Sequence, residues 1–159
     1  MANYCRKRLF KIDVGSIKLN IINIGETKLA YAKEGWSEYT KRLGHFHQLR
    51  ISHLADKQNT AANILTTAGQ ATIIAMVIDG PQLSSPKLAD FLEQSAQNGK
   101  ELCFIIGGPD GLQDEVIQAA HKKLSLSELT FPHDLAMVIL AETLYRASTI
   151  AAGHPYHRA

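Results

Sequence analysis

The sequence predicts a single-domain α/β fold with a mainly parallel sheet. Strand-like and helix-like segments alternate along the chain, five of each, and this alternation is typical of parallel βαβ units. Residues 72–78 (TIIAMVI) are apolar on both faces, as expected of a central parallel strand that helices cover from two sides. With 159 residues, the chain is long enough to bury one hydrophobic core.

Two strand–helix pairs are expected before this central strand. Lys18–Ile24 and Gln48–Leu54 are β-prone runs that end at turn residues or polar segments. Between them, residues 29–43 repeat apolar side chains at helical spacing and stop before a glycine. Residues Ala61–Ala68 follow as a short helix with a polar cap residue in front.

Two further helices and two further strands are expected after the central strand. Ser85 and Pro86 form a helix start, because proline suits the first helical position, and the helix follows over 87–97. A fourth strand at 101–106 leads into a glycine-rich loop. We then expect a helix at 112–123 and a fifth strand at 126–131, which ends before a proline.

The last helix, expected at 135–152, is apolar around nearly its whole circumference. Asp134 is a candidate N-cap, because its carboxylate can accept from the free N–H groups of the first turn. Gly153 is a candidate C′ residue that ends the helix. Such a helix must be covered on several sides, either by its own domain or by a second subunit. We therefore expect an obligate homodimer that forms through this helix.

Composition narrows the classes of protein. No apolar run is long enough for a membrane span and no signal peptide is visible, so we expect a cytoplasmic protein that does not bind a membrane. Residues 1–50 contain ten lysines or arginines and four acidic residues, a net charge of +6, whereas the rest carries −4. This basic half either meets nucleic-acid phosphates or is a solvated helix face.

Three loops are candidate ligand sites, because ligands gather at the carboxyl ends of parallel strands. They are residues 79–81, 107–111 and 131–134. The loop 107–111 (GGPDG) has three glycines, which allow close approach of a ligand to the backbone. It is neither a GxGxxG fingerprint nor a Walker A loop. It is therefore either a site for a nucleoside or small polar ligand, or a tight βα turn.

The end of the chain, residues 154–158 (HPYHR), is unusually rich in functional groups. Two imidazoles, a phenol and a guanidinium in five residues indicate that the C-terminal tail has a functional role. No metal site is expected there, because no cysteine or carboxylate follows the histidines and a proline separates them. Glu142 and Arg146 have the spacing of a helical ion pair, for which a positioning role is plausible.

Four runs resemble one protein family: 104–112 (FIIGGPDGL), 125–133 (SLSELTFPH), 141–147 (AETLYRA) and 154–158 (HPYHR). The chain is similar to the bacterial large-subunit ribosomal RNA pseudouridine N3-methyltransferases, which are small members of the SPOUT superfamily. The resemblance covers residues 18–159, a methyltransferase domain, and leaves 1–17 as an N-terminal extension. It implies a homodimeric α/β domain with a C-terminal trefoil knot.

The resemblance also implies S-adenosylmethionine as cofactor, with S-adenosylhomocysteine as product and no metal. The substrate would be N3 of a pseudouridine in helix 69 of 23S rRNA, in the large subunit or the assembled ribosome. The implied cofactor contacts are Met76, Gly107, Leu126, Ser127, Glu128, Leu129, Thr130 and Phe131. Met76 departs from the leucine common in the family, and residues 56–59 are shorter than the usual basic loop.

The implied catalytic residues lie in the tail. Tyr156 and His157 would contact the base or assist the loss of its proton, while His154 and Arg158 would bind phosphate or ribose, with His133 as a further candidate. Two alternatives stay open. One is a non-catalytic RNA-binding or ribosome-assembly factor, and the other is a SPOUT methyltransferase that acts on another RNA nucleoside.

Overall fold

The computed structural model describes residues 15–158, in which five parallel strands form one sheet in the order β2-β1-β4-β3-β5. The strands are β1 Lys18–Ile24, β2 Gln48–Leu54, β3 Thr72–Met76, β4 Leu102–Ile106 and β5 Lys122–Leu124. The helices are α1 Ala30–Leu43, the 3₁₀ helix η1 Asp56–Gln58, α2 Ala61–Ala68, α3 Ser85–Gln97, α4 Asp114–Ala119 and α5 His133–Ala151. The predicted α/β class with a parallel sheet is confirmed.

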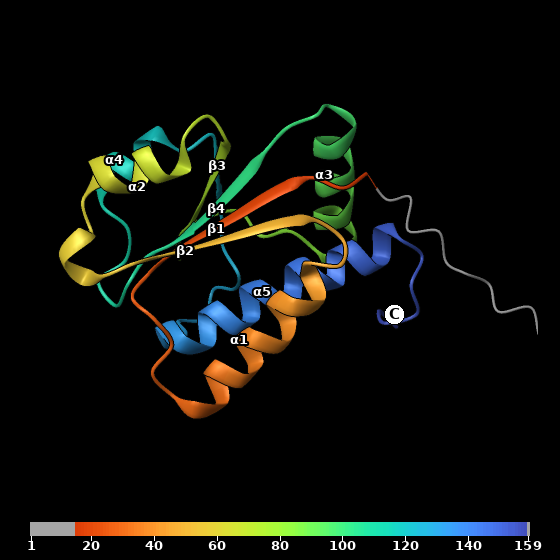
Figure 1. Cartoon of the computed structure of the whole chain (residues 1–159), viewed down its shortest axis with the longest axis horizontal. Helices are drawn as coiled ribbons and strands as arrows, with labels where there is room; N and C mark the ends of the chain where they lie inside the picture. The colour runs from red at the N-terminus through yellow and green to blue at the C-terminus, as the bar shows by residue number, and fades with distance from the viewer. Residues whose placement is uncertain (1–14, 159) are drawn as a thin grey trace, which may run out of the picture.

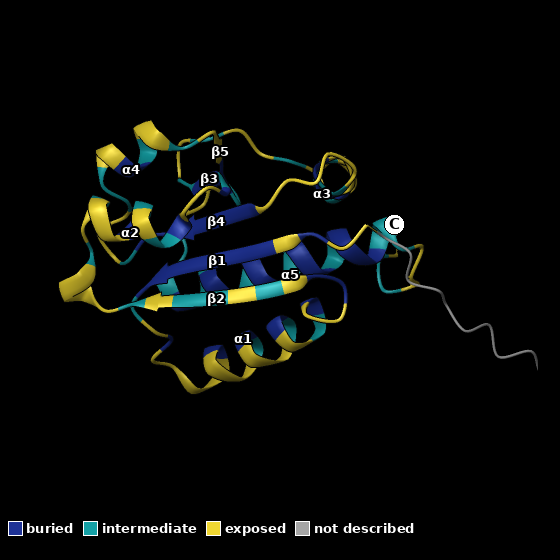
Figure 2. Ribbon diagram, turned by 45° about the horizontal axis from the view of Figure 1, so that its top comes forward, coloured by how far each residue is buried: buried dark blue, intermediate teal, exposed yellow. Residues whose placement is uncertain are grey.

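The sheet lies between two layers of helices. Helices α1, α3 and α5 cover one face, and α2 and α4 cover the other (Figure 1). Strand β4 serves both layers, since Phe104 faces the first core and Ile105 the second. Figure 2 shows β1 and β4 buried in the middle and β2 alternating between exposed and half-buried residues at the edge. The apolar runs in the sequence therefore belong to the inner strands.

Ile17 is buried just before β1, so the folded part begins at or before this residue. Most of the predicted extension, residues 1–14, lies outside the described residues, as does residue 159. The trefoil knot that the resemblance implies stays a prediction. Within residues 15–158, no helix combines the length and the apolar character that crossing a bilayer would require.

The end of the sheet differs from the prediction. The helix expected at 112–123 is wrong over its last four residues, because α4 ends at Ala119 and Lys122–Leu124 pairs with β3 as strand β5. The strand expected at 126–131 is also wrong, since this segment forms bends and irregular backbone. Two serines bond locally there: Ser125 Oγ donates to the Ser127 carbonyl at 2.8 Å, and Ser127 Oγ accepts from Leu129 N at 3.1 Å. Such bonds compete with a strand ladder.

The start of α5 also differs from the prediction. Asp134 is not the N-cap; Pro132 holds that position and Asp134 lies in the first turn. Its carboxylate instead accepts from the backbone N–H groups of Lys28 and Leu29, both at 2.7 Å. Burial raises the pKa of Asp134, but these hydrogen bonds and nearby positive charges outweigh it, so the pKa lies below its ordinary value. The bonds join the starts of α1 and α5.

The end of α5 is as predicted. Gly153 has φ of 63° and follows the C-cap Ala152. Gly153 N donates to Ile150 O at 3.0 Å and His154 N donates to Thr149 O at 2.8 Å. These two bonds form a Schellman motif, which needs a residue in the left-handed region at C′ and so favours glycine.

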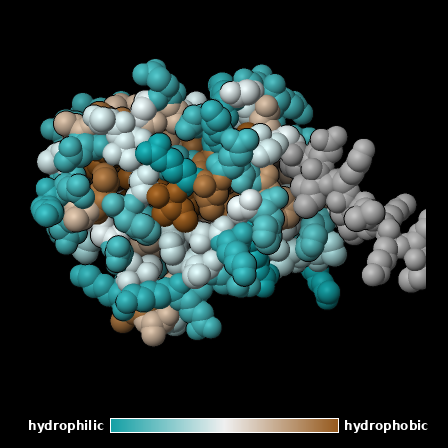
Figure 3. Space-filling model, viewed as in Figure 1, coloured by the Kyte–Doolittle hydropathy of each residue, from teal (hydrophilic) through white to brown (hydrophobic). Residues whose placement is uncertain are grey.

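Helix α5 is covered by the sheet, α1 and α3 on all sides but one. One stripe along the helix stays partly exposed. It consists of Leu135, Ile139, Thr143, Arg146 and Ile150. These residues are three or four positions apart, so they share one helix face. On the face of the molecule seen in Figure 3, apolar side chains also reach the surface over the middle of the sheet. The domain therefore leaves apolar surface available to a partner.

Buried His47 should make stability depend on pH. Burial lowers the pKa of His47 to about 4, and its Nε2 lies 2.8 Å from Ser148 Oγ. In the unfolded chain His47 has its ordinary pKa of about 6.5. Between pH 4 and pH 6.5 the imidazole is therefore protonated in the unfolded state but neutral in the folded state. Stability should therefore be complete above pH 6.5 and fall as the pH drops towards 4, by about 3 kcal/mol in all.

Urea unfolding between pH 5 and 7.5 measures this dependence. His47→Gln should be less stable at pH 7.5 but should lose less on acidification than the unchanged protein. An equal loss in both proteins would show that another group carries the pH dependence.

Candidate functional site

A pocket lies at the carboxyl edge of the sheet, where the segments after β3, β4 and β5 meet. It has a volume of about 180 Å³ and is lined by Met76, Val77, Ile78, Ile106, Gly107, Gly108, Pro109, Gly111, Ser125, Leu126, Ser127, Leu129, Thr130, Phe131, His133 and Ala136. The segment after β5 is held there by backbone bonds from Val77 N to Leu124 O and from Ser125 N to Pro81 O. We call this cavity the knot-side pocket, after the trefoil knot, which is itself only predicted for this chain.

Seven of the eight predicted cofactor residues line the knot-side pocket: Met76, Gly107, Leu126, Ser127, Leu129, Thr130 and Phe131. The eighth, Glu128, lines an adjoining cleft of about 560 Å³ together with Asp79, and Ile78 borders both cavities. The segment predicted as a strand therefore supplies the expected residues, but as an irregular loop.

The glycine-rich loop is both a tight turn and a wall of the pocket. Gly111 has φ of 80°, and its N–H donates to Gly108 O at 2.9 Å, which closes the turn. A Cβ on Gly107 would lie 2.4 Å from the Gly111 carbonyl carbon, so only glycine fits without moving the loop. The two interpretations that the sequence left open are thus compatible.

The sequence interpretation missed several lining residues, among them Ile78, Ile106, Pro109 and Ala136. Ile78 lies just after β3, Ile106 ends β4 and Pro109 lies in the loop after β4, so their place at strand ends was the available signal. Ala136 lies in the first turn of α5. Ile78 and Leu129 are 58% and 70% exposed although both are large and apolar. Exposed apolar side chains around a concave site are suited to cover a ligand.

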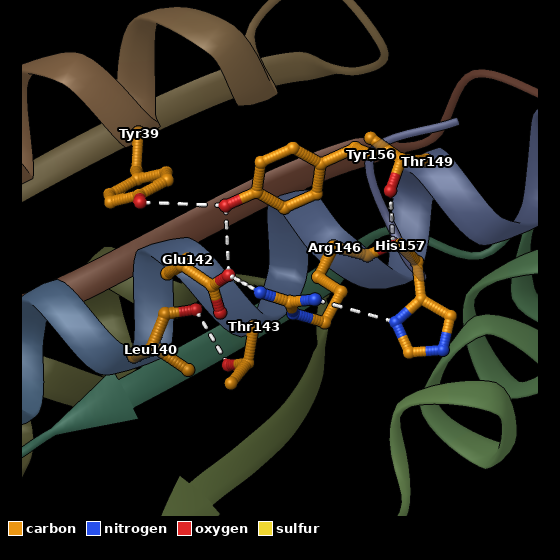
Figure 4. Close-up of polar contacts among 8 residues, drawn as sticks. All are labelled: Tyr39, Leu140, Glu142, Thr143, Arg146, Thr149, Tyr156 and His157. Carbon is orange, nitrogen blue, oxygen red and sulfur yellow. Dashed lines mark hydrogen bonds and ion pairs between the residues drawn. The ribbon is translucent and has the colours of Figure 1, made fainter. Parts of the chain in front are cut away.

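The predicted tail residues are not at this pocket, and instead fold back over α5 and α1 (Figure 4). The Tyr156 hydroxyl donates to Glu142 Oε1 at 3.0 Å and lies 3.4 Å from the Tyr39 hydroxyl oxygen. The Tyr156 ring packs edge-on against Tyr145, with 4.7 Å between centroids. The tail is therefore anchored at Tyr156 rather than free along its length.

Arg146 connects the tail to the predicted ion pair. Its guanidinium pairs with Glu142, lies 5.0 Å from the Tyr156 ring centroid, and has Nη1 3.4 Å from His157 Nδ1. The hydrogen bond with Glu142 raises the pKa of Arg146. Burial, together with hydrogen bonds to Tyr39 and Glu142, raises the pKa of Tyr156. Tyr156 thus stays a protonated phenol at neutral pH, which makes it a hydrogen-bond donor rather than a base.

The tail and the pocket of one chain are far apart. His133, at the pocket, begins α5, and Arg146, at the tail, lies thirteen residues further on, which is about 20 Å along a helix. Figure 1 shows the chain end near the opposite end of α5 from the strand arrowheads. His154 and Arg158 are exposed there. One chain therefore does not bring its own tail groups to its own pocket.

Among the described residues, no group of three or more histidine, cysteine, aspartate or glutamate side chains is placed to hold a metal ion. Cys103 is buried within β4, and burial raises its thiol pKa to about 12. The chemistry that the described residues offer is accordingly that of a backbone-lined pocket and a polar tail cluster.

In a parallel α/β protein, ligands bind at the carboxyl ends of the strands, which is where the loops of this sheet form their pocket. The family model described as "Predicted SPOUT methyltransferase" matches residues 17–157. The chain therefore belongs to the SPOUT methyltransferase family.

Relatives narrow the position of the chain within this family. It is 48% identical over 145 residues to "Ribosomal RNA large subunit methyltransferase H" of Deinococcus radiodurans, covering 89% of this chain and 99% of the relative. It is 39% identical over 159 residues to the protein of that name from Bacillus pumilus, covering 89% and 100%. A probable methyltransferase structure from Bordetella pertussis shares the fold, with a TM-score of 0.60 at 12% identity over 86% of this chain and 97% of that one.

Proposed function

We propose that the protein is a methyltransferase of ribosomal RNA that uses S-adenosylmethionine to methylate N3 of a pseudouridine in helix 69 of 23S rRNA. The observation that carries this proposal is the knot-side pocket, in which seven of eight expected cofactor residues meet. The names of the relatives and the family membership support ribosomal RNA as the substrate. A cytoplasmic location, where ribosomes are, belongs to the same proposal.

The knot-side pocket fits an adenosyl cofactor in its lining. Apolar side chains and bare backbone from the glycine loop and the 125–131 segment surround it, which suits a flat aromatic base held by backbone groups. Its volume of about 180 Å³ is below the roughly 300–1,000 Å³ typical of ligand sites. The ligand would therefore extend into the adjoining cleft of Asp79 and Glu128, whose carboxylates can accept hydrogen bonds from hydroxyl or ammonium groups.

The cofactor supplies a methyl group that is already activated on a sulfonium. The protein then needs only to align the base and to accept a proton, because the bond from N3 to the methyl carbon forms as the carbon–sulfur bond breaks and the N3 proton leaves. Tyr156 would contact the base by exchanging partners, because its one hydroxyl proton is donated to Glu142 when no RNA is bound. His157 is the tail residue suited to receive the proton, and His154 and Arg158 are exposed for contact with RNA.

The tail acts on the pocket of a second copy in this proposal. The partly exposed stripe of α5 runs along the helix from the pocket end to the tail end. A two-fold axis perpendicular to this stripe would make the two α5 helices run antiparallel. The tail end of one α5 would then lie beside the pocket end of the other. Dimerisation would thereby cover the stripe and complete two sites.

Two measurements test the proposed function. Isothermal calorimetry should show saturable binding of S-adenosylmethionine, whereas a protein that only binds RNA would show none. Mass spectrometry of 23S rRNA from a strain lacking the gene should show the methyl group on pseudouridine in helix 69 only after the protein is added. Methylation of another nucleoside would overturn the assignment of the base but not that of the reaction.

A further inference from the structure

A second cleft borders the knot-side pocket, and nothing in the proposed mechanism uses it. It has a volume of about 630 Å³ and lies between the segments after β1 and β2 and the start of α5. Its lining includes Lys28, Lys33, His53, Asp56, Pro109 and His133. Pro109 and His133 also line the knot-side pocket, so the two cavities adjoin. We call it the lateral cleft.

His53 is held in one orientation in this cleft. Asn23, which is fully buried in β1, places its side-chain Nδ2 2.6 Å from His53 Nδ1 and 2.5 Å from Gly25 O. His53 itself is exposed at the end of β2. A buried amide thus fixes an exposed imidazole, which is the arrangement of a positioning residue behind a ligand-binding one.

The same contacts define the tautomer of His53. Gly25 O is only an acceptor, so the Asn23 amide must point its nitrogen, not its oxygen, at this carbonyl. The second N–H of that nitrogen then points to His53 Nδ1, which must accept it. The proton of the neutral ring is therefore on Nε2, at the side of the ring away from Asn23. His53 presents a fixed N–H donor to the cleft.

His133 adds a polar group that needs a partner. Its Nε2 is buried and has no hydrogen-bond partner among residues 15–158, and His133 lines both cavities. A buried polar atom without a partner destabilises the folded state. A ligand at the junction of the two cavities would remove this destabilisation.

The charges of the lateral cleft favour a neutral polar group over a bare phosphate. Lys28 and Lys33 are balanced by Glu26 and Asp56, while Asp134 is occupied by two backbone N–H groups. A mixture of donors and acceptors without excess positive charge suits the edge of a nucleobase. RNA-binding proteins commonly read unstacked bases in this way.

We propose that the lateral cleft binds one unstacked nucleotide of the RNA substrate, with a carbonyl oxygen of its base accepting a hydrogen bond from His53 Nε2–H. This inference rests on the proposed function, because it needs RNA at the neighbouring pocket. It assigns the specificity-determining role to His53 and the positioning role to Asn23.

Single-turnover methylation of large ribosomal subunits that lack the modification tests the role of His53. At saturating S-adenosylmethionine, His53→Ala should raise the subunit concentration for half-maximal rate about fivefold to tenfold, the effect of one lost hydrogen bond. His53→Gln keeps a side-chain N–H donor and should recover part of this loss. Cofactor affinity should stay within twofold in both, because His53 does not line the knot-side pocket.

His45→Ala is the matched control, since His45 is also an exposed histidine but lies in the turn before β2. It should leave the half-maximal concentration unchanged. If the unchanged protein methylates and His53→Ala behaves like His45→Ala, the lateral cleft does not hold substrate, while the proposed function stands. If the unchanged protein neither binds the cofactor nor methylates, the proposed function itself fails.

The tautomer offers a readout that does not depend on activity. Long-range ¹H–¹⁵N NMR spectra should show the His53 proton on Nε2, and Asn23→Leu should release the ring into a mixture of tautomers. Addition of an RNA hairpin with the sequence of the substrate loop should shift the His53 Nε2–H resonance in the unchanged protein. A ring protonated on Nδ1, or a resonance that the hairpin does not move, would overturn the proposal.

Discussion

Truncation after Gly153 is expected to lower single-turnover methylation of ribosomes at saturating cofactor by at least about a hundredfold. Residues 154–158 supply the alignment and proton transfer in our account, and general acid–base assistance alone contributes about 10²–10⁴-fold. S-adenosylmethionine affinity should change less than threefold, because no tail residue lines the knot-side pocket. Calorimetry and rapid-quench kinetics on the same preparation measure both quantities.

The truncated protein should also be slightly less stable. Tyr156 packs against Tyr145 and bonds to Glu142, and an aromatic pair contributes about 0.5–1.5 kcal/mol.

Point variants separate this loss of stability from catalysis. Tyr156→Phe and His157→Ala should lower kcat, whereas Arg158→Ala should raise KM for RNA and weaken its salt dependence. A truncated protein that methylates within about twofold of the intact rate, far short of one 1.4 kcal/mol decade, would remove the tail from the mechanism.

Gly107→Val is expected to weaken S-adenosylmethionine binding tenfold or more, which is about 1.4 kcal/mol. The reason is a collision within the loop itself. A Cβ at Gly107 would collide with the backbone of Gly111 and Leu112, so the turn must move and distort the pocket wall before any ligand is met. Unchanged affinity in a folded variant would separate Gly107 from the cofactor site.

Gly108→Ala is the matched control. Gly108 lines the pocket, but a Cβ there meets only atoms of Ile24, at an ordinary 3.5 Å or more, and Ile24 does not line the pocket. It should bind the cofactor normally. Leu129→Ala covers the case in which Gly107→Val does not fold, since Leu129 is 70% exposed at the pocket. Loss of this apolar contact should weaken binding severalfold without changing thermal stability.

The main features of the fold were predictable because hydrophobic burial leaves periodic patterns in the sequence. Strands β1 and β2 and helix α2 have the predicted bounds, and Gly153 ends α5 as expected. Trp36, one of the apolar residues repeated at helical spacing in 29–43, is buried. These features depend on local spacing and on residues with one dominant conformational role.

The errors fall where tertiary contacts override local preference. Lys122–Leu124 is a strand because it pairs with β3, and no periodicity in three residues reveals a pairing partner. Asp134 looks like an N-cap, yet the helix that it stabilises is α1, more than a hundred residues away in sequence. Sequence spacing contains no information on such distant contacts.

The candidate site was predictable as a set of residues but not as an arrangement. Resemblance identified the segments that line the pocket, and their position after strands explains why they meet. The resemblance did not indicate that Tyr156 is held against Tyr39 and Glu142, at a distance along α5 from the pocket. This separation follows from the length of α5, and it is the reason for assigning the tail to a second copy.

Mixing two defective variants tests this assignment most directly, at a cofactor concentration that saturates the intact pocket but leaves Gly107→Val largely unbound. Gly107→Val has a defective pocket and an intact tail, whereas truncation after Gly153 leaves the pocket and removes the tail. When equal amounts exchange subunits, half of the dimers are mixed, and each mixed dimer has one site with an intact pocket and a tail from the other chain. We expect methylation to recover to about one quarter of the intact rate. A mixture that exchanges subunits but stays inactive would show that pocket and tail must belong to one chain, and would contradict the account.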